Sequence, residues 1–271
     1  LGLADCSAVC AVRIEGALEI ETLQRAIRHL VSQHEVLRTT FKLLPAMTIP
    51  VQVIAEASDF AFASHDFSEL GAADQDSRIS NLLSDARERK IDYARMPVLR
   101  VDLIKCSAGK HVLIISLPVL CADVQSLECL VSQITQPVNV EVLQYADFAE
   151  WKNELLEAEE AAVARQYWRQ QDLSKLDAQK FFFEKRDGAR KAFHRGAQRV
   201  EISEATSARI RMIANRSETS PSSFALACWQ ILISRLTEQS NTVVGVAVDG
   251  RKFAELEQSI GLFSTFVPVA S

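Results

Sequence analysis

The sequence has no excess of basic residues and no long hydrophobic run, and each absence excludes a class of protein. Its 30 Lys and Arg are outnumbered by 35 Asp and Glu, which gives a formal net charge of −5 at pH 7. Because the basic residues are scattered among acidic ones, we expect no nucleic-acid partner. No apolar run approaches the roughly 18 to 20 residues that span a bilayer, and residues 1–16 lack the pattern of a signal peptide. We therefore expect a cytoplasmic protein with no membrane partner.

The sequence also lacks paired redox or metal-binding motifs. Its six cysteines contain no CxxC pair, and no histidine lies at zinc-finger spacing from them. Four of them lie inside apolar segments, so we expect reduced cysteines that pack as small hydrophobic residues, and no metal site. The six are Cys6, Cys10, Cys106, Cys121, Cys129 and Cys228.

Strand and helix patterns alternate along the first part of the chain. Residues 7–14 predict a strand, and apolar residues at helical spacing over 23–31 predict a helix with one apolar face. Residues 47–54 predict an edge strand, because the proline within them removes a donor from the ladder. Residues 78–90 predict an exposed, charged helix.

A predicted hairpin leads to the loop in which a site is most expected. Residues 100–106 and 111–117 form its strands, and the second is so apolar that we expect it to be central and buried. Pro118 ends that strand, and Asp123 is a suitable N-cap for the amphipathic helix that follows. Residues 118–123 therefore lie at a strand end, where functional sites often occur.

The second part of the chain repeats this alternation. It predicts a strand near residues 198–202, a helix N-capped by Ser203, an apolar helix opened by Ser220 and Pro221, and a buried strand over 242–248. We expect an α/β protein with an N-terminal lobe (1–170), a linker (171–188) and a partial C-terminal lobe (189–271). Without an initiator Met, and with the chain stopping after an apolar run, both ends look cut and the second lobe looks truncated.

Several segments resemble the motifs of nonribosomal peptide synthetase condensation domains, in the same order. Residues 34–41, HEVLRTTF, resemble RHExLRTxF with Gln33 at its first arginine, and residues 145–151, YADFAEW, resemble YxDFAxW. The other matches are Tyr167-Trp168 (YW), Thr219-Ser220-Pro221 (TP), Val243-Val244-Gly245 with Gly250-Arg251 (VVG and GR), and Ile260-Gly261-Leu262-Phe263 with Val267-Pro268 (IGxFxNxLPL).

The resemblance implies a chloramphenicol acetyltransferase-like fold, with two related lobes forming a V around a tunnel. It implies acyltransferase chemistry in secondary metabolite biosynthesis, in which an acceptor amine attacks a donor thioester to form an amide bond. The implied partners are peptidyl or acyl carrier protein domains, whose phosphopantetheine arms enter the tunnel, and a neighbouring adenylation domain. No cofactor would be bound directly. The second histidine of the family's HHxxxDG motif orients or deprotonates the amine.

That motif is degenerate in this chain. An ungapped alignment puts Pro118 and Val119 at the two histidines, Asp123 at the aspartate and Val124 at the glycine, so only the aspartate remains. The resemblance implies that this aspartate is structural and held by an arginine, for which we expect Arg38. The other positions with an implied structural role are Tyr145, Asp147 and Arg251.

Few residues could replace the missing base. Asp123 and Cys121 are weak catalytic candidates, since a carboxylate paired with arginine is a poor base and no cation lies near enough in sequence to activate the thiol. His111 lies roughly 25 Å upstream of the motif at about 3.3 Å per strand residue, so it cannot reach. We expect the remaining histidines to be solvated: His29, His34, His65 and His194.

These residues leave two principal hypotheses and a weaker one. The first is a catalytically impaired condensation-like domain that acts as a scaffold facing the carrier proteins, or as a platform that recruits a tailoring enzyme. The alternative is an active acyltransferase that joins its carrier-bound substrates by positioning alone, since tethering raises their effective concentration. The third is a degenerate remnant without function.

Overall fold

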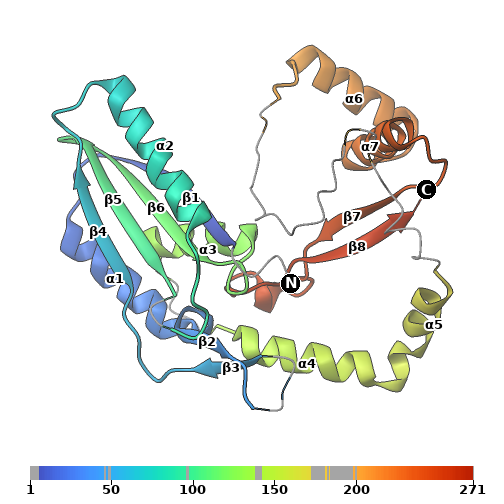
Figure 1. Cartoon of the computed structure of the whole chain (residues 1–271), viewed down its shortest axis with the longest axis horizontal. Coiled ribbons are helices and arrows are strands. Elements are labelled where there is room, and N and C mark those ends of the chain that lie inside the picture. Colours follow the sequence, from blue (N-terminus) through green and yellow to red (C-terminus); the bar gives the residue numbers. More distant parts are fainter. Residues whose placement is uncertain are drawn as a thin grey trace. The chain divides into compact units, whose positions relative to one another are not determined.

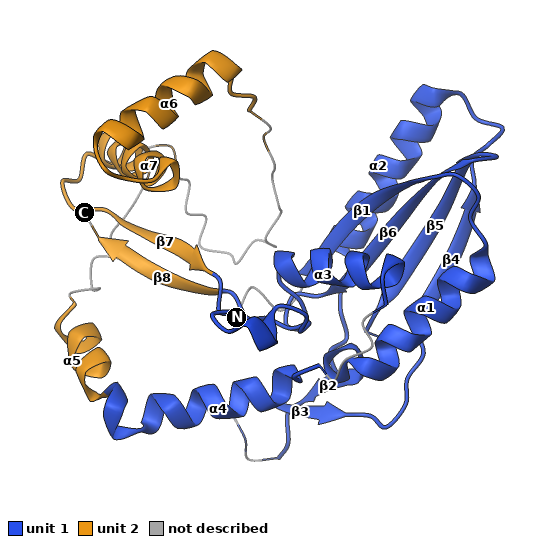
Figure 2. Ribbon diagram, turned by 180° about the vertical axis from the view of Figure 1, so that it is seen from behind, with its two compact units in different colours: residues 1–161, 249–264 blue, residues 162–248, 265–271 orange. Residues whose placement is uncertain are grey.

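The computed structural model describes residues 6–45, 47, 50–95, 98–137, 142–171, 181, 183, 198 and 200–270. The chain divides into two compact units, each containing helices and strands: residues 1–161 with 249–264, and residues 162–248 with 265–271 (Figure 2). This division departs from the predicted lobes, because residues 249–264 return to the first unit and the boundary follows residue 161. The predicted linker lies almost wholly outside the described residues.

The first unit is built on a four-stranded sheet with the order β1-β6-β5-β4 (Figure 1). Its strands are β1 (Ser7–Glu15), β4 (Ala61–Asp66), β5 (Arg100–Ser107) and β6 (Lys110–Pro118). All neighbours are antiparallel except β4 and β5. The predicted hairpin is therefore confirmed, and its second strand, β6, is central as expected.

Helices cover both faces of this sheet. On one face, α1 (Ile20–Gln33) and α3 (Val124–Thr135) pack against the odd-numbered residues 113, 115 and 117 of β6. On the other, α2 (Ala72–Glu88) packs against Val112 and Ile114. Successive strand side chains point to opposite faces, so β6 is buried on both sides and its continuous apolar run is explained.

Shorter elements complete the first unit. A 3-10 turn, η1 (Glu35–Arg38), leads into β2 (Thr39–Lys42), which pairs antiparallel with β3 (Val51–Ile54). β3 covers the last four residues of the expected edge strand, of which residues 48 and 49 lie outside the described part of the chain, and the expected charged helix begins earlier, as α2. The remaining elements are α4 (Tyr145–Glu157), η2 (Glu159–Ala161) and η4 (Ala254–Leu256).

The second unit contains α5 (Ala162–Gln170), α6 (Glu204–Arg216), α7 (Pro221–Thr237), β7 (Val243–Val248) and β8 (Thr265–Ala270). Ser203 and Ser220 cap α6 and α7 through their side chains, as predicted. The strand expected near 198–202 does not form in its described residues, and 199 lies outside them. β7 was expected to be buried, but only Val243 is, because β7 pairs with β8 alone in the described sheet.

Among the described residues, no helix combines the length and the apolarity that crossing a bilayer requires.

Substitution of two isoleucines of α1, one buried and one exposed, tests which face of this helix belongs to the core. Ile27 has no exposed surface, whereas Ile20 is 42% exposed on the same helix. We expect Ile27→Ala to lower the free energy of unfolding by about 2 to 5 kcal/mol, because it removes buried methyl groups and leaves a cavity. Ile20→Ala, the matched control, should cost less than about 1 kcal/mol, as measured by urea denaturation. Equal losses in the two variants would contradict this assignment of the core.

Candidate functional site

The loop after β6 is held tightly at both ends. Pro118 still pairs with Ser7 of β1, and the amide of Val119 donates to the carbonyl of Cys6 at 3.1 Å. The amide of Cys121 then donates back to the carbonyl of Pro118 at 2.9 Å, which closes a turn. Asp123 ends the loop as the N-cap of α3, since its Oδ1 accepts the amide of Ser126 at 2.8 Å. The predicted N-cap is confirmed.

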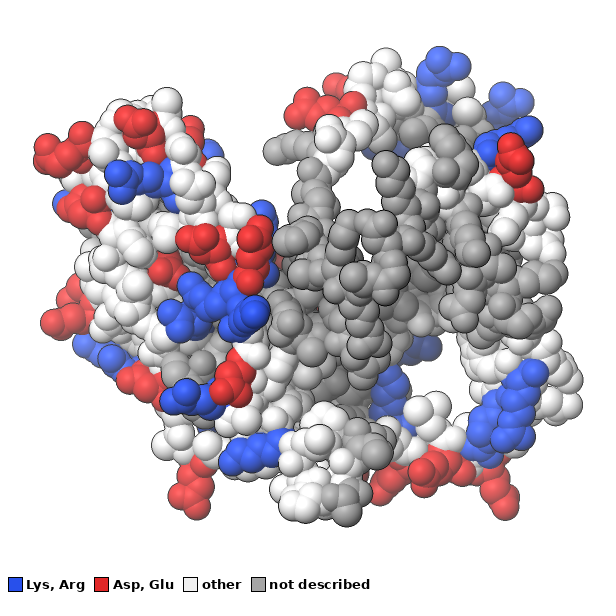
Figure 3. Space-filling model, in the orientation of Figure 1, with Lys and Arg blue, Asp and Glu red and all other residues white. Residues whose placement is uncertain are grey.

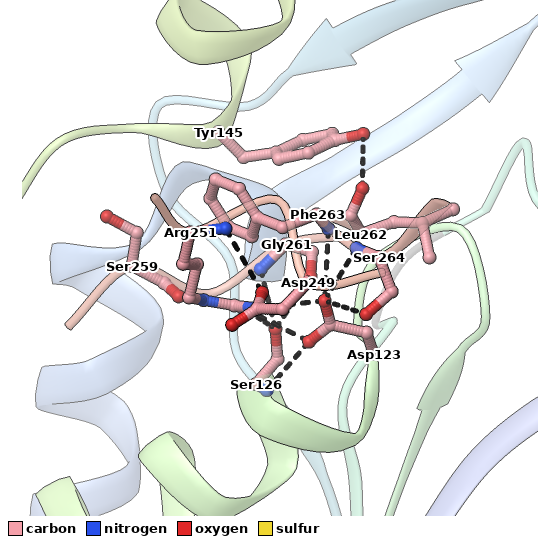
Figure 4. A network of polar contacts seen from close by, with 10 residues as sticks. All are labelled: Asp123, Ser126, Tyr145, Asp249, Arg251, Ser259, Gly261, Leu262, Phe263 and Ser264. Atoms are coloured by element: carbon pink, nitrogen blue, oxygen red, sulfur yellow. Dashed lines mark hydrogen bonds and ion pairs between the residues drawn. The ribbon is translucent and has the colours of Figure 1, made fainter. Parts of the chain in front are cut away.

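Asp123 also forms a buried, two-pronged ion pair with Arg251 (Figure 4). Nη1 of Arg251 lies 2.9 Å from Oδ2, and Nη2 lies 3.1 Å from Oδ1. The side chains are only 3% and 2% exposed, respectively. Such bidentate, charge-assisted bonds are among the strongest in proteins and fix the orientation of both groups.

The carboxylate of Asp123 receives three more hydrogen bonds from the segment that follows Gly261. Oδ2 accepts the amides of Phe263 and Ser264 at 3.1 and 3.0 Å, and the hydroxyl of Ser264 at 3.0 Å. Burial alone would raise the pKa of Asp123, but the bonds from Arg251 and Ser126 outweigh it and lower the pKa to about 2. Asp123 is therefore an ionised anchor at neutral pH.

Ser126 connects the same partners a second time. Its hydroxyl oxygen accepts from Nη2 of Arg251 at 2.7 Å and from the amide of Gly261 at 2.9 Å, while it donates to the carbonyl of Gly261 at 2.6 Å. The guanidinium of Arg251 also lies 4.2 Å from the centroid of the Phe263 ring, a cation–π contact. Sequence reasoning missed Ser126, because its partners Arg251 and Gly261 lie 125 and 135 positions away in the chain.

Tyr145 explains why the segment needs a glycine at position 261. A Cβ atom there would lie 2.3 Å from Cδ2 of the Tyr145 ring, a distance that real Cβ atoms do not show. The hydroxyl of Tyr145 donates to the carbonyl of Leu262 at 3.1 Å, so this tyrosine also holds the segment in place. Asp147, the other motif residue of α4, is exposed and takes no part in this network.

The expected pairing of Asp123 with Arg38 is wrong. Nη1 of Arg38 donates to the carbonyl of Ala55, and Nη2 lies 3.7 Å from a carboxylate oxygen of Glu35. Arg38 thus ties η1 to the residue that follows β3. The arginine that holds Asp123 lies 128 positions further along the chain and could not be chosen from local spacing.

The other candidates for a base or nucleophile are not poised for chemistry. Cys121 has no exposed surface, and burial raises the pKa of its thiol to about 12. His34 was expected to be solvated, but it is 1% exposed and its Nε2 lies 2.8 Å from the side-chain oxygen of Gln133. Burial lowers the pKa of His34.

The remaining histidines and cysteines add no second cluster. His29 is exposed, His65 is half-buried with its Nε2 3.0 Å from Asp102, and His194 lies outside the described residues. All six cysteines are free thiols, and Cys228 is exposed, whereas the other five are buried or half-buried. Within the described part of the chain, no three His, Cys, Asp or Glu side chains are grouped so as to hold a metal ion.

Comparison with known proteins gives consistent matches. Residues 6–271 match a family model described as condensation domain. The chain is 24% identical over 258 residues to bacitracin synthase 2 of Bacillus licheniformis, a match that covers 93% of this chain and 10% of that synthase. Among solved structures, SgcC5 of Streptomyces globisporus has a TM-score of 0.81 at 23% identity, over 97% of this chain and 61% of that one.

A second solved relative is the X-domain from teicoplanin biosynthesis, whose structure was determined in a complex with OxyB. It matches with a TM-score of 0.70 at 20% identity, over 97% of this chain and 60% of that one. The chain therefore spans about three fifths of these structural relatives and a small part of the synthase. The structural likenesses confirm the predicted chloramphenicol acetyltransferase-like α/β fold.

Removal of the Arg251 side chain should destabilise the protein, because it leaves a buried charge without its partner. We expect Arg251→Ala to lower the free energy of unfolding by about 3 to 5 kcal/mol, because Asp123 would keep its charge without its main partner. Arg25→Ala, on the exposed side of α1, is the matched control and should change stability by less than about 0.5 kcal/mol. Urea denaturation followed by circular dichroism measures both. A loss at Arg251 as small as the control's would refute the anchoring role.

The same ion pair predicts how stability depends on pH. Because folding lowers the pKa of Asp123 from 3.8 to about 2, its ionised form stabilises the fold above about pH 4, and this contribution is lost as the pH falls toward 2. The advantage of the wild type over Asp123→Asn in free energy of unfolding should therefore shrink by about 2 kcal/mol between pH 5 and pH 2. Asp76→Asn, exposed on α2, controls for the substitution itself. A gap that stays constant over this range would contradict the assignment.

Proposed function

The chain belongs to the condensation-domain family, and on this premise we propose that it is a condensation-like domain of a nonribosomal peptide synthetase that lacks amide-forming activity. In this role it serves as a scaffold facing the carrier proteins, or as a platform that recruits another enzyme. The observation that carries the proposal is the loop over 118–123, where proline and valine stand at the motif histidines and the remaining aspartate is fully engaged by Arg251.

Amide formation requires a group that can take a proton from the acceptor amine. A protonated amine has no lone pair with which to attack a thioester, and a positioned imidazole with a pKa near neutrality is the usual acceptor. Neither Pro118 nor Val119 carries an ionisable group. Neither motif position therefore supplies the base that amide formation needs.

The neighbouring side chains do not supply a substitute. With a pKa of about 2, the carboxylate of Asp123 has little affinity for a proton at neutral pH, and its oxygens already accept bonds from Arg251, Ser126, Phe263 and Ser264. The thiol of Cys121, with a pKa of about 12, is almost entirely protonated. A thiol in that state is a poor nucleophile as well as a poor base.

The proposed partners follow from family membership and from the likeness to a peptide synthase. They are the peptidyl or acyl carrier domains, which would present phosphopantetheine arms, and a neighbouring adenylation domain. Recruitment of a tailoring enzyme is supported by the X-domain, a fold relative that was solved in a complex with a second protein, OxyB. In such a role the surface matters and the motif histidines do not.

A condensation assay with the complete protein tests the proposal. Donor and acceptor carrier proteins are loaded with aminoacyl groups, and the carriers are analysed by intact-protein mass spectrometry. We expect the wild type to form no dipeptidyl carrier above the level of a reaction without the protein, while it still binds at least one loaded carrier. Val119→His and the double variant Pro118→His/Val119→His are run beside it, since they restore the motif's side chains.

Each result of this assay decides something. Dipeptidyl product from the wild type would show that positioning alone suffices, and the proposal of an inactive domain would be abandoned. Absence of both product and carrier binding would remove the scaffold role. Product that arises only in the histidine variants would show that the missing base is what prevents turnover.

A further inference from the structure

A cavity of the first unit lies beside Pro118, on the side of the sheet that α2 covers. It has a volume of about 180 Å³. Its walls come from the segment that follows α2, from the start of β5, and from the paired ends of β1 and β6. The strand register explains the convergence, because Arg100 pairs with Ser116 and Ser7 pairs with Pro118.

The lining of this cavity is strongly cationic in an otherwise acidic protein. Four basic residues contribute to it, namely Arg89, Lys90, Arg95 and Arg100, against the single carboxylate of Asp92. That carboxylate accepts the amide of Ala94 at 3.1 Å. Within the described part of the chain, none of the four basic side chains forms an ion pair. Figure 3 shows Lys and Arg side chains gathered over the segment below α2, with acidic side chains at their border.

One nitrogen atom of these basic side chains is already removed from water. Nη1 of Arg89 is buried and has no hydrogen-bond partner among the described residues. A guanidinium can only donate, and a buried donor without an acceptor costs about 1 to 3 kcal/mol, or more when charged. An oxygen atom placed in the cavity would remove that cost. The cavity therefore favours an acceptor that carries negative charge.

The rest of the wall is apolar. Ile91 and Pro118 contribute apolar atoms to this side of the lining, whereas Val98 and Leu117 belong to the main core and are only 7% and 1% exposed. A free inorganic anion would use the basic residues but would leave this surface against water. A ligand with an anionic head and a short apolar stem would use both.

We propose that this pocket binds an oxyanion group, a carboxylate or a phosphate, carried on a short apolar stem. The identity of the ligand rests on the proposed function, in which carriers deliver thioesters to this end of β6. Two sources share the chemistry: an acidic side chain of the tethered acyl or aminoacyl group, and the phosphate of the arm itself. The pocket then selects among tethered groups by charge.

Two matched pairs of small molecules separate these sources. Pantetheine 4′-phosphate is compared with pantetheine, and N-acetylglutamate with N-acetylglutamine, by isothermal titration calorimetry or ligand-observed NMR on the complete protein. We expect the charged member of at least one pair to bind about tenfold more tightly than its neutral partner at low ionic strength. Added salt should weaken that preference. The pair that shows it identifies the source.

The side chains responsible are tested by removing charge without disturbing the core. Arg95→Gln and Arg100→Gln change exposed residues of the lining, so the fold should be retained, which circular dichroism checks. Each should reduce the preference for the charged probe about tenfold. Arg87→Gln is the matched control, because Arg87 is exposed on the last turn of α2 and does not line the cavity. It should leave the preference unchanged.

The pocket is rejected if neither charged probe binds better than its neutral partner, or if Arg87→Gln weakens binding as much as the lining variants do. Inorganic phosphate alone is titrated as well, and binding as tight as that of pantetheine 4′-phosphate would overturn the role of the apolar wall. These probes need no carrier protein. Failure of the pocket would leave the scaffold proposal standing, and failure of carrier binding would leave the pocket measurable.

Discussion

The buried ion pair between Asp123 and Arg251 is the interaction on which the rest of the first unit depends. Two charges removed from water are stable only when nearly every donor and acceptor is satisfied. Here Ser126, two backbone amides and the hydroxyl of Ser264 satisfy the carboxylate, and Nε of Arg251 is the one buried atom of the pair that has no hydrogen-bond partner among the described residues. Asp123 caps α3 and Arg251 belongs to a segment from much later in the chain, so the pair holds residues 249–264 against the start of α3 in the first unit.

The bonds that hold Asp123 in place also make it unsuited to proton transfer. A carboxylate that receives a bidentate guanidinium and four further donors is held in one orientation, and its pKa of about 2 leaves it unsuited to accept a proton. The loop before it is tied at Val119 and Cys121 by backbone bonds that do not depend on the side chains. These backbone bonds require no histidine at position 118 or 119, and the fold alone does not decide the function.

The two faces of the central strand, β6, pack against different surroundings. Ile115 and Leu117 pack under α1 and α3 in the main core. On the opposite face, Ser116 and Pro118 reach the cationic cavity beyond the end of α2. The loop over residues 118–123 thus begins where a hydrophobic core and a charged pocket meet, and both are fixed by the register of β6 with β1 and β5.

Local patterns in the sequence determined most of the helices and strands, including the central hairpin strand and the helix caps Ser203 and Ser220. The sequence alone also shows that positions 118 and 119 carry no histidine. Periodicity and capping act over a few residues, so they can be read without a fold. The partner of Asp123 was decided only by the tertiary structure, because Arg38 and Arg251 carry the same charge and only packing brings one of them within reach. Burial of His34 against Gln133, 99 positions away, was decided in the same way. Contacts between distant segments depend on how whole faces pack, and no short stretch of sequence contains that information.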